Sequence, residues 1–281
     1  MGVLLLVNNT HAHEAGAPFS GAIIDPLVLH HAHIESEQRL NLFALRGVQG
    51  FGDAKRNAFE SEFELAWAND RFNFGVEAFV PFRNVPSPDG QGRQIGIGDI
   101  EIRPIKWAFI NQPDLVISTA TGIGLPTGNR ERGLGSGNMT LTQFLFLDKA
   151  YGNWYLGLNL AADTRLKGES GNGVEYGAVV AYSFINGTAM PGIADPLPHQ
   201  SLVISPSLEL VGSKRLSGLD SAERSLSVLP GLTFWWPQSG WQLHAGVNIP
   251  ISGSREADRI YLLQIGNHFN WENLLGGGKH Y

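Results

Sequence analysis

Five histidines stand near the start of the chain, and imidazole nitrogen is a common metal ligand in proteins. They are His11, His13, His30, His31 and His33. If a leader is removed after Ala12, His13 becomes the first residue and offers its amine and its ring to copper. His30, His31 or His33 could then complete a copper or zinc site. The alternative is a polar arm whose histidines only form hydrogen bonds; no other cofactor is expected.

A second chemical candidate is the glycine-rich stretch GIGLPTGNRERGLGSGN, residues 122–138. A phosphate-binding loop needs a Lys-Ser or Lys-Thr pair and a following helix. The next residues, MTLTQFLFL, alternate like a strand, so a nucleotide site is excluded and the glycines indicate turns. Arg130 and Arg132 at this loop mouth either form an electropositive lip for anions or are ordinary solvated charges.

Carboxylates with a spacing of two form the third candidate. In AFESEFELAWA, residues 58–68, Glu60, Glu62 and Glu64 share one face of a strand, while aromatic and aliphatic side chains share the other. The next run, RFNFGVEAFVPF, repeats the pattern after the two-residue turn Asn69-Asp70, which predicts a hairpin.

The alternation continues to the end of the chain and predicts about twelve strands. We expect them near 34–46, 58–68, 71–82, 97–110, 114–125, 139–149, 153–165, 174–185, 201–213, 223–236, 241–252 and 258–271. Short turns and long, glycine-rich loops alternate between them, which is typical of outer-membrane barrels. The connection 186–200 departs from this rule, because it is long on the short-turn side.

The apolar faces are crowded with tryptophans, several of them at strand ends: Trp67, Trp154, Trp235 or Trp236, Trp241 and Trp271. Aromatic girdles at strand ends are typical of membrane barrels and less expected in a soluble sandwich. The predicted fold is therefore an all-β, transmembrane, antiparallel up-and-down β-barrel of about 12 strands in a bacterial outer membrane.

The polar faces would then line the lumen. The residues concerned are Glu35, Glu37, Arg39, Glu60, Glu62, Glu64, Arg71, Glu77, Asp99, Glu101, Arg103, His244 and His268, with Glu175 and Glu209 in the same phase. Isolated buried charge is costly, so these groups either form an ion-pair network that narrows the lumen or line a cation-preferring pore.

The division of the chain follows from these strands. Residues 1–12 are either the remnant of a signal peptide or a plain extended start, and 13–33 form a His-rich periplasmic arm long enough to enter the lumen. Residues 34–271 form the barrel, and 272–281 form a periplasmic tail.

Composition excludes some functions. The 281 residues carry a net charge of −6, which argues against a nucleic-acid partner. No Ser-His-acid constellation falls on the outer wall, because alternation places His244 and His268 inside, so no catalytic residues and no enzyme are predicted.

The middle of the chain resembles a known family. GIGDIEIRPIKWAFI (96–110), GIGLPTGNRERGLGSG (122–137) and DKAYGNWYLGLNL (148–160) are similar to outer-membrane barrels named after the meta-pathway of phenol degradation, the MetA-like transporters. The resemblance implies passive or facilitated passage of small, hydrophobic or aromatic molecules. Membrane lipid or lipopolysaccharide and a small-molecule solute are the expected partners.

The alternative function is a structural barrel that holds a periplasmic or extracellular metal or redox partner. The His-rich arm and the long connection 186–200 would provide the contacts. Passage and scaffolding both remain open at the level of sequence.

Overall fold

The protein is built almost entirely from strands. The computed structural model describes residues 24–49, 55–167, 171–185, 202–218, 223–237 and 239–268. Within these ranges lies one 3₁₀ turn, η1 (Asp70–Phe72), and no helix is long and apolar enough to cross a membrane. The strands are β1 (Glu37–Gln49), β2 (Lys55–Asn69), β3 (Phe74–Pro86), β4 (Arg93–Ile97), β5 (Ile100–Gln112), β6 (Leu115–Leu125), β7 (Met139–Tyr151), β8 (Trp154–Lys167), β9 (Gly171–Tyr182), β10 (Val203–Arg215), β11 (Arg224–Trp236), β12 (Trp241–Gly253) and β13 (Arg259–His268).

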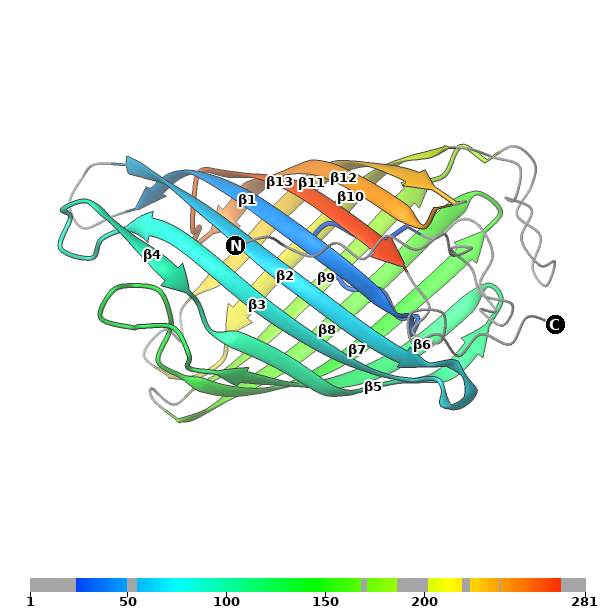
Figure 1. The fold of residues 1–281 in the computed structure, drawn as a ribbon, viewed down its shortest axis with the longest axis horizontal. Coiled ribbons are helices and arrows are strands. Elements are labelled where there is room, and N and C mark those ends of the chain that lie inside the picture. Colours follow the sequence, from blue (N-terminus) through cyan, green and yellow to red (C-terminus); the bar gives the residue numbers. More distant parts are fainter. Residues whose placement is uncertain are drawn as a thin grey trace.

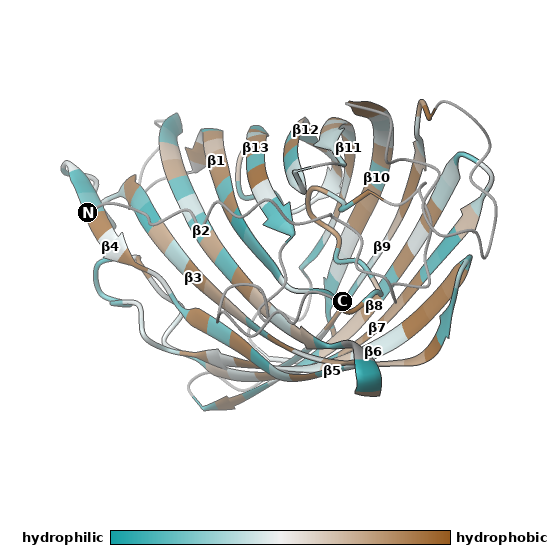
Figure 2. Cartoon of the chain, turned by 45° about the vertical axis from the view of Figure 1, so that its right-hand side comes forward, coloured by the Kyte–Doolittle hydropathy of each residue, from teal (hydrophilic) through white to brown (hydrophobic). Residues whose placement is uncertain are grey.

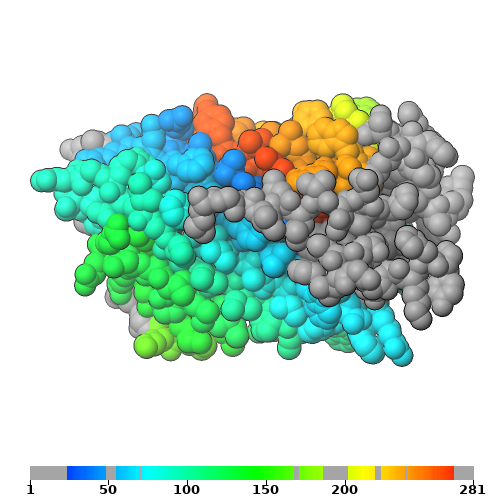
Figure 3. Space-filling view, viewed as in Figure 1, coloured from blue at the N-terminus to red at the C-terminus, as the bar shows by residue number. Residues whose placement is uncertain are grey.

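The strands close into an antiparallel barrel (Figure 1). β1 pairs with β2 on one side and with β13 on the other, so no edge is left open there. The space-filling view accordingly shows the blue first strands beside the orange last ones (Figure 3). β4 and β5 pair with separate halves of β3 and form one barrel strand interrupted at Gly98-Asp99. The barrel therefore has twelve strands, which confirms the predicted fold.

The outer face of the barrel is apolar. On β8, the alternate residues Trp154, Leu156, Leu158 and Leu160 are 48–52% exposed, while Tyr155 between them is fully buried. Figure 2 shows this alternation as brown and teal bands along the strands. Exposing so large an apolar surface to water is unfavourable, whereas contact with lipid hydrocarbon carries no such cost.

The tryptophans follow the same division. Trp67 and Trp154 are exposed on the outer face near the short turns, as the sequence predicts. Of the pair left open by the sequence, Trp236 is exposed and Trp235 is buried with Val203 and Ile185. Trp271 and the connection 186–200 lie outside the described residues.

Candidate functional site

The chain's own residues 24–36 lie within the barrel, and we call this segment the plug (Figure 1). Its apolar side chains are buried against inward-facing wall residues. Leu27 packs with Leu229 and Leu262, and Leu29 packs near Tyr155 and Val179. The described part of the predicted arm is thus part of the molecule's interior.

The wall is shaped to receive two of these leucines. Gly231 and Gly246 face each other on β11 and β12, and a Cβ at either would lie 2.5 Å from a methyl group of Leu27. A Cβ at Gly177 on β9 would lie 2.3 Å from Leu29. Only glycine lets the plug approach so closely at these positions.

Two wall carboxylates hold the plug backbone. Glu209 on β10 accepts hydrogen bonds from the amides of Leu27, Val28 and Leu29, at 2.5, 3.1 and 3.1 Å. Asp148 on β7 accepts a hydrogen bond from the Ala32 amide at 2.6 Å. These bonds satisfy plug amides that no strand pairs, which a buried backbone requires.

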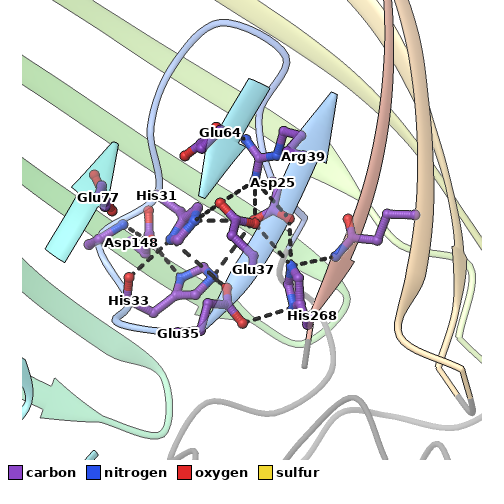
Figure 4. A network of polar contacts seen from close by, with 12 residues as sticks. Asp25, His31, His33, Glu35, Glu37, Arg39, Glu64, Glu77, Asp148 and His268 are labelled. Atoms are coloured by element: carbon purple, nitrogen blue, oxygen red, sulfur yellow. Dashed lines mark hydrogen bonds and ion pairs between the residues drawn. The ribbon is translucent and has the colours of Figure 1, made fainter. Parts of the chain in front are cut away.

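A polar network joins the plug to the start of β1 and the end of β13 (Figure 4). Asp25 lies 3.2 Å from Arg39 and 3.0 Å from His268, and Arg39 also donates two hydrogen bonds to Glu37. His268 contacts Glu35 at 2.9 Å. Asp25 and Glu37 are buried, so pairing with Arg39 and the histidine is what makes their charges tolerable.

The plug histidines His31 and His33 stack face to face, with ring centroids 4.0 Å apart. His33 lies 2.6 Å from Glu35 and 2.9 Å from Asp148. Burial lowers the pKa of His33, but the Glu35 and Asp148 carboxylates outweigh it and raise that pKa to about 10. These carboxylates therefore create a strongly negative electrostatic potential around the His33 ring.

His30 occupies a different environment from its neighbours. Arg103 donates to His30 Nε2 at 2.9 Å, and the His30 ring lies edge-on to Phe79 and Phe146. Burial and the positive charge of Arg103 lower the pKa of His30 well below its ordinary value. A neutral imidazole that accepts a hydrogen bond from arginine has no lone pair left there for a metal.

Arg103 itself is enclosed on all sides. It donates to Glu101 at 2.6 Å and to Glu77 at 3.1 Å, and its guanidinium lies 4.3 Å from the ring centroid of Phe144. Lys106 bonds the other oxygen of Glu77 at 2.6 Å. The wall charges here are paired, in keeping with a narrowed lumen.

Beyond the plug, toward the long-loop end, lies a cavity of about 430 Å³. Val28, Leu29 and His30 of the plug line it on one side, and Ser136 and Asn138 of the β6–β7 connection lie on the other. Its walls carry the charged residues Glu101, Arg103, Asp163, Arg165, Glu175 and Arg215 beside the apolar Phe144, Ala161 and Val211.

Most predicted lumen residues lie inside the barrel. Glu35, Glu37, Arg39, Glu64, Glu77, Glu101, Arg103, His244 and His268 lie in or beside the networks above. Glu60 pairs with Arg83 at 2.7 Å, and Glu62 accepts a hydrogen bond from Asn41.

Two of the predicted lumen residues are placed elsewhere. Arg71 lies exposed in the turn η1, because four residues, Asp70 to Asn73, connect β2 to β3. The predicted two-residue turn Asn69-Asp70 is therefore wrong, since Asn69 still pairs with Phe74 in the sheet. Asp99 lies at the break between β4 and β5 and holds the loop 126–138, accepting hydrogen bonds from the Gly128 amide and from the amide and hydroxyl of Ser136.

The glycine-rich stretch therefore ends β6 with its residues 122–125 and forms a loop with the rest, and it is not a phosphate cradle. Arg132 donates to Gln94 and to the carbonyl of Ile95, so it lies against β4, while Arg130 is exposed on the same loop. His13 lies outside the described residues. His30 does not join the cluster of His31 and His33.

Sequence reasoning missed three residues that organise the site: Asp25, Lys106 and Asp148. Asp25 stands in an irregular segment with no periodicity to place it. Asp148 does stand in phase with the buried residues Phe144 and Phe146, and that phase was the available signal.

No family model matches the chain, and no curated protein matches it. Among solved structures it is similar to the COG4313 outer membrane channel from Pseudomonas putida F1, with a TM-score of 0.58 and 14% identity over 88% of this chain and 100% of that chain. The fold is that of an outer-membrane β-barrel. KdgM porin (TM-score 0.47, 10% identity, 84% and 100% covered) and LpxR from Salmonella typhimurium (0.48, 11%, 83% and 100%) are more distant. Membership of the MetA-like family stays a prediction.

Proposed function

We propose that the protein is a channel through which small molecules cross the bacterial outer membrane, and that the plug controls its lumen. The observation that carries this proposal is that Val28, Leu29 and His30 of the plug line the cavity of about 430 Å³. The plug is joined to the wall by side chains and no strand pairing. Its departure would open the lumen and leave every strand pair intact.

The lining favours a particular kind of solute. Phe144 and Val211 supply apolar surface, while Arg215 supplies hydrogen-bond donors close by, since its Nε and Nη2 donate to no group in the described structure. The solute class proposed is small aromatic molecules that carry one polar group, since a ring can pack on Phe144 while its polar group meets a guanidinium. The exposed apolar band would contact membrane lipid, and lipopolysaccharide in the outer leaflet.

Planar-bilayer conductance and solute uptake by liposomes test the proposal. The wild type should conduct weakly. A variant that begins at residue 34, and so keeps only the last three residues of the plug, should conduct several times more and admit phenol-like solutes faster than a sugar of equal size. Heat-dependent migration on gels shows that each variant is folded.

A folded variant without the plug that neither conducts nor admits solute would contradict the channel. Co-purification of a second protein with that closed barrel would favour the scaffolding alternative.

A further inference from the structure

Four potential metal ligands meet within eleven residues of the plug. They are Asp25, His31, His33 and Glu35, and one ligand atom from each lies within 4.8 Å of the other three. Two imidazoles with two carboxylates form a donor set suited to divalent transition metals such as zinc. None of the four belongs to a barrel strand.

Hydrogen bonds orient both rings toward one point. His31 Nδ1 lies 3.0 Å from the carbonyl oxygen of His33. A carbonyl only accepts, so Nδ1 carries the proton and Nε2 keeps its lone pair. His33 Nδ1 lies 2.9 Å from Asp148, which turns its Nε2 toward Glu35 and Asp25. Without metal this Nε2 shares a proton with Glu35 at 2.6 Å, and a bound ion would displace that proton. A histidine held by a carboxylate on its other nitrogen is the usual outer-shell arrangement of metal sites.

Asp25 gives an independent indication of a ligand. Its side chain is 3% exposed, and Oδ2 contacts Arg39 and His268. Oδ1 is buried and accepts no hydrogen bond. It points instead to His31 Nε2 at 3.6 Å and to His33 Nε2 at 3.9 Å. A buried carboxylate oxygen without a donor is costly, and a cation between these atoms would satisfy it.

Charge points the same way. Asp25, Glu35, Glu37 and Glu64 surround the site, and the guanidinium of Arg39 is shared by three of them. The other neighbouring cations are histidines, whose positive charge depends on protons. A divalent ion would take the place of histidine protons as the positive charge beside these carboxylates.

We propose that Asp25, His31, His33 and Glu35 bind one divalent transition-metal ion, with zinc as the probe, and that the bound ion fixes the plug in the lumen. The ion links both ends of the plug's loop to each other. Asp25 Oδ2 and Asp148 then connect that closed loop to the wall. The binding site stands independently of transport, whereas the fixing of the plug rests on the proposed channel.

Zinc titration of the full chain in detergent tests the site, and cobalt absorption reports tetrahedral coordination. All proteins carry His11→Gln, His13→Gln, His199→Gln and His280→Gln and no histidine tag, so histidines outside the described part do not contribute. We expect one zinc per chain. His31→Gln and His33→Gln should weaken binding by at least about 10–100-fold. His30→Gln is the matched control, since His30 faces Arg103, and it should bind like the parent protein.

Equal binding by the parent protein and by His31→Gln and His33→Gln, or no saturable binding by the folded parent, would overturn the site. Conductance measurements distinguish the metal site itself from the proposed fixing of the plug. Zinc should close the parent protein and a chelator should reopen it, with no effect on His33→Gln. If the variant that begins at residue 34 conducts and the parent ignores zinc, the fixing of the plug is wrong. If no variant conducts but zinc binding follows the expected pattern, the channel fails and the site stands.

Discussion

At the scale of the residue, carboxylates on the barrel wall hold the plug by accepting hydrogen bonds from its backbone amides. Glu209 is fully buried and accepts hydrogen bonds from three backbone amides of the plug, which lies about 180 residues away in the chain. A carboxylate has lone pairs for all three, while an amide side chain has one oxygen and adds two donors. Replacing Glu209 therefore changes the acceptor count without changing the volume.

We predict that Glu209→Gln loosens the plug and leaves the barrel folded. At least one buried amide loses its acceptor, at a cost of about 1–3 kcal/mol, and each 1.4 kcal/mol shifts the docking equilibrium about tenfold. Single-channel recording should show more frequent open events. Glu62→Gln is the control, because Glu62 accepts a hydrogen bond from Asn41 on the neighbouring strand and bonds no plug residue in the described structure. Equal open probability in the two variants would contradict the role of Glu209.

At the scale of the element, the sequence predicts the strands well, because a period of two is a local property of each run. β2, β3 and β7 lie where alternation places them, and the interior residues Glu64 and Glu77 follow the same phase. The prediction for Arg71 is wrong, because the alternation of a strand does not continue through its turn. The plug has no period, and its partners are distant in the chain, so its position could not be derived.

The loop 126–138 is another element whose conformation depends on one distant side chain. We predict that Asp99→Asn releases it, because the carboxylate accepts from Gly128 and twice from Ser136. Trypsin should then cleave after Arg130 and Arg132 several times faster than in the wild type. Asp89→Asn is the control, since Asp89 lies in a neighbouring exposed loop and bonds the nearby Gln91 amide. Unchanged cleavage would show that other contacts hold the loop.

The fit between plug and wall is also a property of elements. We predict that Gly231→Ala with Gly246→Ala displaces Leu27, since both new methyl groups would lie 2.5 Å from its Cδ1. Overpacking of this kind costs about 1–3 kcal/mol, and the conductance should rise. Leu27→Ala in the same background should relieve the clash with Leu27 but not the 2.9 Å approach of the residue-246 methyl group to the Pro230 carbonyl. It should therefore restore part of the lost stability, which makes the substitutions non-additive. Gly266→Ala is the control, because its Cβ would have ordinary contacts at 3.7 Å. Simple additivity of the three substitutions would exclude a direct clash.

At the scale of the whole molecule, the barrel and the plug have separate sources of stability. The barrel closes through strand pairs. The plug is held by wall carboxylates, by close contacts of its leucines with wall glycines, and by the histidine cluster. The alternation in the sequence predicts the strand pairs that close the barrel, but it does not predict the contacts that hold the plug. A protein built this way can keep its wall while its lumen changes between two states, which is what a gated channel requires.

That separation predicts the effect of tying the plug down. The chain has no cysteine, so a single engineered pair, Leu27→Cys with Gly231→Cys, reports without interference. The two positions are close, since a Cβ at 231 lies 2.5 Å from the Leu27 methyl group. We expect the oxidised protein to stay closed and the reduced protein to regain at least the wild-type conductance, while each single cysteine variant ignores the redox state. If solutes pass around a plug that never moves, oxidised and reduced protein will conduct equally, and gating by the plug is wrong.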